Sequence, residues 1–230
     1  MQSRREAAKA ERRARIIRAA RELIRETGSS GLSMRALAAR AGVSLATPYN
    51  LFGSKGAVLV AVLEDIKGFG SRFAAYRGRD PLERAVCAAE LAVAYYEEDP
   101  EFYRALWTCI LGSEGAEARS ALFNPKRDAF WLGLLKEAQD AGLLLPEIDL
   151  RLLMRSLDHG FRSAMLHWVL GDLPLAALRP ATAYAYALTL RGAATADAQA
   201  GLLALALERQ QAMAAAADDT GAALPAGDAA

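Results

Sequence analysis

The segment from Ser33 to Gly56 combines helix-capping residues, a central glycine and polar side chains. Ser33 is a favourable N-cap, and the apolar residues after it recur at the spacing of a short helix. Gly42 can take the left-handed conformation that ends a helix, and Ser44 is a second N-cap. The pattern therefore predicts two short helices joined by a tight turn, the arrangement that places a second helix in the major groove of DNA.

The second predicted helix and its surroundings carry groups that bind nucleic acids. Thr47, Tyr49 and Asn50 supply hydroxyl and amide groups, which bond to phosphates or base edges. Ser54 then caps a further predicted helix and puts Lys55 at its first position, where the helix dipole disfavours a cation unless an anion binds beside it. Backbone N–H groups and a lysine at one helix start form an anion site, so this pair predicts a contact with the DNA backbone.

The stretch AGVSLATPYNLFGSKGAVL resembles the DNA-binding signature of TetR-family transcriptional repressors, and the resemblance covers residues 12–63. It implies that Arg35 contacts a base or a phosphate, that Leu45 faces base edges, that Thr47 and Tyr49 hold phosphates, and that Lys55 clamps the backbone. The expected DNA-binding residues are Ser33, Arg35, Ser44, Leu45, Ala46, Thr47, Tyr49, Asn50 and Lys55.

Pro48 departs from the family pattern, which usually has Leu, Ile or Val at this position. Proline lacks an N–H donor and biases Thr47 away from the helical conformation. If Ser44 caps the helix, Pro48 is its fourth residue and about one hydrogen bond is lost. If Thr47 caps it and Pro48 is its first residue, a favoured pairing, the recognition helix is shorter. The sequence leaves both alternatives open.

Charge is distributed unevenly along the chain. Residues 1–60 contain 12 Lys or Arg against 4 Asp or Glu, a net charge of +8, whereas residues 61–230 contain 16 against 23, a net charge of −7. A basic first part and an acidic second part suit a protein that meets a polyanion with one end. Arg4 and Arg5 are interpreted either as an arm that reaches DNA or as a frayed tail.

The resemblance and the helical periodicity together predict an all-α fold, with an N-terminal three-helix helix-turn-helix domain and a larger C-terminal helical domain for ligand binding and dimerisation. From residue 193 onward 17 of 38 residues are Ala, which favours one more helix before a disordered end. We expect a basic flexible arm at 1–11, the helix-turn-helix DNA-binding domain at 12–56, a connecting helix at 57–67, a helical effector-binding and dimerisation domain at 68–192, an Ala-rich helical extension at 193–216 and a disordered tail at 217–230.

Aromatic residues concentrate in the second part of the chain, and pockets between helices are commonly lined by such side chains with a few polar groups. The same stripe at helical spacing is also typical of an ordinary core. The expected effector-binding residues are Tyr103, Trp107, Phe130, Trp131, His159, Ser163 and His167.

Two predicted helices, at 148–170 and 178–192, correspond to those that pair with their copies in a four-helix bundle in the resembling family. Small residues on their faces would permit close crossing, although the same faces could be the core of a single chain. The expected dimer-interface residues are Leu153, Leu157, Gly160, Phe161, Ala164, Trp168, Tyr184 and Leu188.

Several classes of protein are excluded or disfavoured by sequence. Apolar windows are interrupted well before the ~18 residues that a membrane span needs. Motifs of hydrolases, P-loop enzymes and dinucleotide-binding enzymes are missing, and the spacing of the histidines does not suit a metal, so we expect no enzyme activity, no cofactor and no metal. Cys87 and Cys109 are interpreted as buried thiols in a reducing cytoplasm, with a redox-sensing pair as the alternative.

The preferred hypothesis is a homodimeric, sequence-specific transcriptional regulator in the cytoplasm. We expect a repressor that a small-molecule effector releases from double-stranded DNA at a palindromic operator. The alternatives are a helical small-molecule carrier and a non-specific architectural DNA-binding protein.

Overall fold

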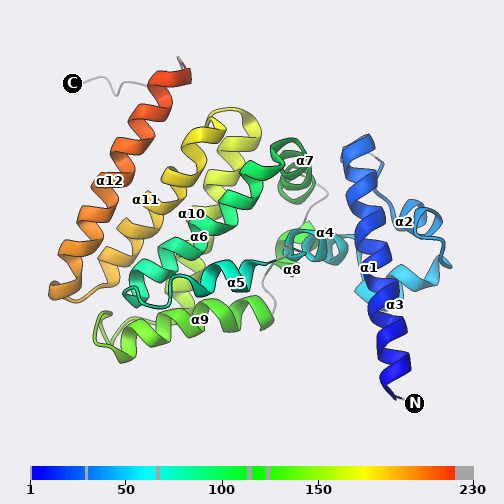
Figure 1. The fold of residues 1–230 in the computed structure, drawn as a ribbon, viewed down its shortest axis with the longest axis horizontal. Coiled ribbons are helices and arrows are strands. Elements are labelled where there is room, and N and C mark those ends of the chain that lie inside the picture. The colour runs from blue at the N-terminus through cyan, green and yellow to red at the C-terminus, as the bar shows by residue number, and fades with distance from the viewer. Residues whose placement is uncertain (1, 29–30, 66–67, 113–115, 123–124, 221–230) are drawn as a thin grey trace. The chain divides into compact units, whose positions relative to one another are not determined.

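The computed structural model describes residues 2–28, 31–65, 68–112, 116–122 and 125–220 (Figure 1). Helices account for most of this described chain, and no strand forms within it, which confirms the predicted all-α class. The chain divides into two compact units, one of Met1–Lys67 with Asp99–Asn124 and the other of Gly68–Glu98 with Pro125–Ala230. The segment 99–124, which we expected within the effector domain, thus groups with the helix-turn-helix region.

The first unit contains six helices among its described residues. They are α1 (Gln2–Thr27), α2 (Met34–Arg40), α3 (Ala46–Phe52), α4 (Lys55–Glu64), α7 (Pro100–Leu111) and α8 (Ala116–Ala121). Apolar residues of α1 at helical spacing, including Ile16, Ala20 and Ile24, are buried in its core. An amphipathic face of this kind must pack against other elements, and α1 packs against α2, α4 and α7.

Helix α4 is apolar on every side because other helices cover it from several directions. It packs against α1, α7 and α8, and its residues from Val58 to Leu63 are all buried. Close contact with α8 depends on Gly56, since a Cβ at that position would overlap the backbone of Glu117 and Ala118. The segment expected to be a connecting helix is thus also a central core element of the first unit.

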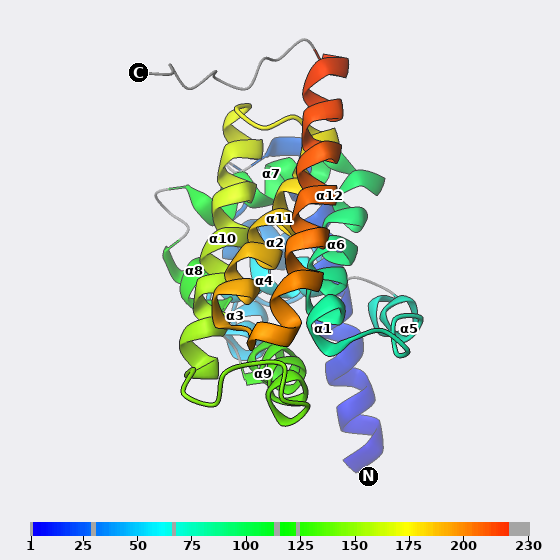
Figure 2. The same cartoon turned by 90° about the vertical axis from the view of Figure 1, so that its left-hand side faces the viewer.

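The second unit also contains six helices among its described residues. They are α5 (Phe69–Ala74), α6 (Pro81–Glu98), α9 (Pro125–Asp140), α10 (Leu150–Leu170), α11 (Leu175–Ala193) and α12 (Ala196–Thr220). Helix α11 is the central one, because it packs against α6, α10 and α12 (Figure 2). Large side chains such as Trp168 and Leu178 are fully buried between these helices.

Two terminal segments differ from expectation. Residues 2–11, expected as a flexible arm, are the first turns of α1, since their Arg, Glu, Ala and Lys residues all favour helix. Helix α12 continues to Thr220, so residues 217–220 of the expected disordered tail are helical, and residues 221–230 lie outside the described residues.

Candidate nucleic-acid interface and effector region

The turn between α2 and α3 has the geometry predicted from its sequence. The Ser33 hydroxyl accepts a hydrogen bond from the Ala36 N–H at 3.1 Å and caps α2. Gly42 lies in the left-handed region at φ +62°, and the Val43 N–H then donates to the Ala38 carbonyl at 3.0 Å. These bonds satisfy backbone groups at both ends of a seven-residue helix and fix the direction in which α3 leaves the turn.

Pro48 is the third residue of α3, so neither predicted register is correct. Leu45 stands at the N-cap with helical dihedral angles, and the Thr47 N–H donates to the Ser44 carbonyl at 2.9 Å. The hydroxyl groups of Ser44 and Thr47 also bond to each other at 2.9 Å. Because the first N–H groups of a helix have no partner within it, proline forfeits no helical hydrogen bond here. Its ring is buried in the core of the first unit.

The residues around Pro48 form the exposed face of α3. Leu45 is 52% exposed and Tyr49 is 51% exposed, although both are large apolar or aromatic side chains. Ser44, Ala46 and Asn50 are also exposed, and Thr47 is half-buried. A short helix that buries one proline and exposes this row presents a surface suited to contact with a groove of DNA.

Lys55 and Arg35 lie at the starts of the helices on either side of α3. The Ser54 hydroxyl accepts from the Ala57 N–H at 3.2 Å, so Lys55 is the first residue of α4, where it is half-buried. Arg35 is exposed in the first turn of α2. Cations at these positions face the positive ends of helix dipoles, an arrangement that a bound phosphate would stabilise.

Two arginines of the basic region have structural roles that sequence reasoning missed. The two terminal nitrogens of Arg40 donate hydrogen bonds to the Glu26 carboxylate, at 2.8 and 2.6 Å, and these bonds connect α2 to α1. The hydrogen bond from Arg40 also lowers the pKa of Glu26. Arg13 donates to the Leu51 carbonyl at 3.2 Å and stacks on the Phe52 ring at 4.2 Å. The net charge of the first 60 residues therefore overstates the number of cations free to meet DNA.

The expected effector-binding residues are divided between the two units. Tyr103 and Trp107 are buried in α7 of the first unit. The other five belong to the second unit, where three of them, His159, Ser163 and His167, are exposed on α10.

Phe130 and Trp131 of α9, by contrast, belong to an aromatic cluster. The Phe130 ring lies 5.8 Å from Phe69 and 5.3 Å from Phe73, and the Trp131 ring lies 5.8 Å from Tyr186. This cluster connects α5, α9 and α11 within the second unit.

A charged cluster that sequence reasoning missed is buried beside these aromatic rings. Asp158 of α10 pairs with Arg162 at 2.5 Å and with Arg127 of α9 at 3.5 Å, although only 11% of its side chain is exposed. Burial raises the pKa of the nearby Tyr186 hydroxyl. The four-residue spacing of Asp158 and Arg162 within an apolar stripe was the signal that the sequence offered.

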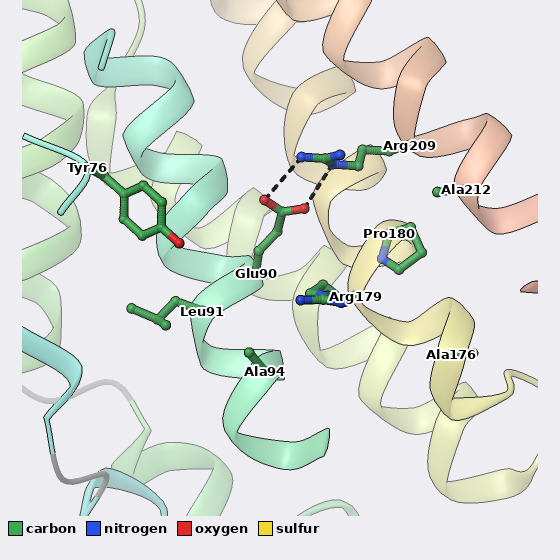
Figure 3. A pocket seen from close by; sticks show the side chains of 9 residues that line it. All are labelled: Tyr76, Glu90, Leu91, Ala94, Ala176, Arg179, Pro180, Arg209 and Ala212. Atoms are coloured by element: carbon green, nitrogen blue, oxygen red, sulfur yellow. Dashed lines mark hydrogen bonds and ion pairs between the residues drawn. The ribbon is translucent and has the colours of Figure 1, made fainter. Parts of the chain in front are cut away.

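A cavity of about 370 Å³ lies between α6, α11 and α12, all within the second unit (Figure 3). Its walls combine small apolar side chains with a few charged ones. They are formed by Tyr76, Glu90, Leu91, Ala94, Ala176, Arg179, Pro180, Arg209 and Ala212. Glu90 and Arg209 form an ion pair across it, with Arg209 Nε 2.8 Å from Glu90 Oε1. None of these lining residues was among the expected effector contacts.

Half of the expected dimer-interface residues are core residues of one chain. Leu153, Leu157, Phe161 and Trp168 are buried, and the Trp168 ring stacks on Tyr96 of α6 with ring centroids 6.5 Å apart. Gly160, Ala164 and Tyr184 are partly exposed, and Leu188 is exposed. The outward apolar residues of α10 are instead Leu152, Leu166 and Leu170.

Among the described residues, no helix is long and apolar enough to cross a membrane, and no group of three or more His, Cys, Asp or Glu side chains is placed to hold a metal ion. Cys87 and Cys109 are free and buried, one in each unit, and burial raises the pKa of both thiols.

Comparison with known proteins agrees with this arrangement. Residues 16–62 match the family described as "Bacterial regulatory proteins, tetR family". The HTH-type transcriptional repressor KstR of Rhodococcus jostii (strain RHA1) is 32% identical over 112 residues, which are 48% of this chain and 53% of that protein. The match thus spans about half the length of this relative.

Solved structures are similar over most of the chain. Full-length TylP, a TetR regulator from Streptomyces fradiae, has a TM-score of 0.60 at 21% identity and covers 94% of both chains. Thermus thermophilus FadR, a TetR-family repressor solved with lauroyl-CoA, has a TM-score of 0.62 at 23% identity over 78% of this chain and 94% of that one. The helix-turn-helix geometry and the match at residues 16–62 identify this segment as a TetR-family DNA-binding region, and the chain as a whole shares its fold with the solved TetR regulators.

Proposed function

We propose that the protein is a homodimeric repressor that binds a palindromic operator and leaves it when a small-molecule effector binds. The observation that carries the proposal is the exposed face of α3, where Leu45, Tyr49 and Asn50 point outward while Pro48 fills the core. Leu45 and Tyr49 are exposed together on this short helix, and such an apolar row suits contact with a partner surface. The positively charged helix starts at Arg35 and Lys55 flank this face and suit the phosphates of a groove.

The short length of α3 is the reason for proposing a dimer. One seven-residue α3 spans too few base pairs for specificity, whereas a two-fold pair reads two half-sites. We place the interface on the outward faces of α10 and α11, where Leu166, Leu170 and Leu188 are exposed. Their leucines would be buried against the same faces of a second copy.

The dimer is tested by sedimentation of the full chain. Leu166→Glu should convert dimers to monomers and abolish tight operator binding, because it buries a charge in an apolar interface. The matched control is Leu203→Glu on α12, where the leucine has nearly the same exposure, 39% against 40%. Retention of the dimer by Leu166→Glu would contradict this placement.

The effector is proposed to bind in the second unit against Phe130 and Trp131. FadR of Thermus thermophilus was solved with lauroyl-CoA, a ligand with a long apolar acyl chain. In this chain the two rings belong to an aromatic cluster and lie on a helix that also contributes Arg127 to the buried ion pairs of Asp158. An effector that alters the packing of α9 would favour one arrangement of the dimer over another, which is what release from DNA requires.

DNA binding is tested by selecting random duplexes against the purified protein over a series of salt concentrations. An inverted repeat should be recovered. Lys55→Ala should weaken binding to all duplexes and reduce the salt slope by about 0.9 for each phosphate that the variant no longer neutralises. Arg35→Ala should instead relax the preference at one base position. The control is Lys136→Ala, which removes an exposed lysine of the second unit.

Two other outcomes would replace the proposal. Salt-sensitive binding without any sequence preference would indicate an architectural DNA-binding protein, and equal losses on specific and random DNA for both variants would contradict the separate roles of Arg35 and Lys55. Recovery of no duplex, together with ligand binding that survives replacement of Tyr49 and Lys55, would indicate a small-molecule carrier.

A further inference from the structure

The cavity between α6, α11 and α12 has the dimensions of a small-molecule site. Its volume of about 370 Å³ lies within the usual range of roughly 300–1,000 Å³ for ligand pockets. Leu91, Ala94 and Pro180 form its apolar wall, and the small side chains of Ala176 and Ala212 leave it open (Figure 3).

The charged residues that line the cavity differ in how strongly they already pair with charged residues of the chain. Glu90, with a side chain only 18% exposed, takes two contacts from Arg209, at 2.8 and 3.4 Å. Arg209 also pairs with Glu208 at 2.8 Å. Arg179 is held more weakly, because it reaches Glu97 through Nε at 3.4 Å and half of its side chain is exposed.

These contacts select the charge of a ligand. Within the lining, Arg179 and Arg209 are positively charged and Glu90 is negatively charged, and Glu97 and Glu208 pair with the two arginines from outside it. A cation would have to displace Arg209 from Glu90, whereas a dianion would face repulsion from Glu90 and from the neighbouring Glu97. A single carboxylate can accept two parallel hydrogen bonds from the guanidinium of Arg179, and this leaves the Glu90–Arg209 ion pair intact.

We propose that this cavity binds a small organic monocarboxylate. Its carboxylate accepts hydrogen bonds from Arg179, with Arg209 as a second positive charge, and its apolar body lies on Leu91, Ala94 and Pro180. The site goes beyond the proposed function, because it lies apart from Phe130 and Trp131 and is closed on one side by α12. A ligand there contacts three helices at once and would hold α12 against α6 and α11.

The test is calorimetric titration of the full chain, without DNA, with straight-chain carboxylates from butanoate to decanoate. At least one member should bind, and the amide of equal length should bind at least about tenfold more weakly, because a charge-assisted bond is lost. Arg179→Gln should weaken carboxylate binding by about tenfold or more and leave the weak binding of the amide unchanged. Ala94→Leu, which fills the cavity and keeps both arginines, should weaken binding of carboxylate and amide alike.

The matched control is Arg155→Gln, which removes an exposed arginine of the same unit that does not line the cavity. It should bind like the wild type. Absence of binding across the series, equal affinity for acid and amide, or equal losses in Arg179→Gln and Arg155→Gln would each overturn the proposal. Because the assay contains no DNA, its result is separate from that of the duplex selection.

Discussion

Replacement of Pro48 by alanine tests the account of the recognition helix, because two interpretations of this proline predict opposite signs. If Pro48 strained a helix interior, alanine would relieve about 3 kcal/mol. In the structure Pro48 is the third residue of α3, and the Ser44 carbonyl already accepts from the Thr47 N–H at 2.9 Å. No such strain should therefore be released.

The expected effect is a loss of stability. Alanine removes two buried ring carbons, which costs about 1.6 kcal/mol at roughly 0.8 kcal/mol for each CH₂. It also restores freedom to the unfolded chain, which costs about 0.4–1 kcal/mol more. The sum is a decrease of about 2 to 2.6 kcal/mol in the free energy of unfolding.

Equilibrium urea unfolding of the full chain, followed by circular dichroism, measures this difference. Pro100→Ala is the matched control, because Pro100 is the first residue of α7 in the same unit and is only half-buried. It should lose mainly the smaller, unfolded-state contribution. An unchanged or increased stability of Pro48→Ala would refute the reasoning and show that the proline strains α3.

Three further predictions concern buried positions. Burial raises the pKa of Glu90, so its carboxyl group binds a proton more tightly in the folded chain than in the unfolded chain. The resulting gain in the free energy of unfolding is fully present below pH 4.5 and is lost as the pH rises through the raised pKa. The urea midpoint of the wild type should therefore fall over this pH range, and that of Glu90→Gln should not. Cys87 and Cys109 should react far more slowly with a disulfide reagent in the folded chain than in the urea-unfolded chain, because both thiols are buried. The reaction is followed by absorbance, and fast reaction of the folded chain would support a redox-sensing role. Gly56→Ala should lower thermal stability by about 1–3 kcal/mol, because its Cβ would overlap the backbone of Ala118, whereas unchanged melting would contradict this packing.

Local features of the helix-turn-helix region could be predicted because their causes lie within a few residues. Ser33 and Ser54 cap helices, and Gly42 takes a positive φ, as the sequence indicated. The start of α3 was misjudged for a local reason too. Thr47 bonds to Ser44 through both its N–H and its hydroxyl, and a simple choice between two caps did not include that geometry.

Longer-range features could not be predicted in the same way. An amphipathic helix shows that one face is buried but not which element buries it, so Trp107 was expected to line an effector pocket although α7 packs against α1 and α4. The partner of Arg40 lies on another helix, and its charge alone suggested DNA rather than Glu26. Likewise Phe161 and Trp168 were expected to face a second chain but fill the core of their own.

The packing of α4 against α7 and α8 bears on how regulators of this kind can be recombined. A chimera cut after residue 67 is the natural choice from the sequence, because it takes the whole helix-turn-helix region. It would separate α4 from two of the helices that cover it and leave buried residues such as Val58 and Val62 without their partners. A chimera that takes its DNA-binding region from this protein should therefore also include residues 99–124. Chimeras without this segment should expose the apolar residues of α4 and aggregate, whichever operator they are designed for.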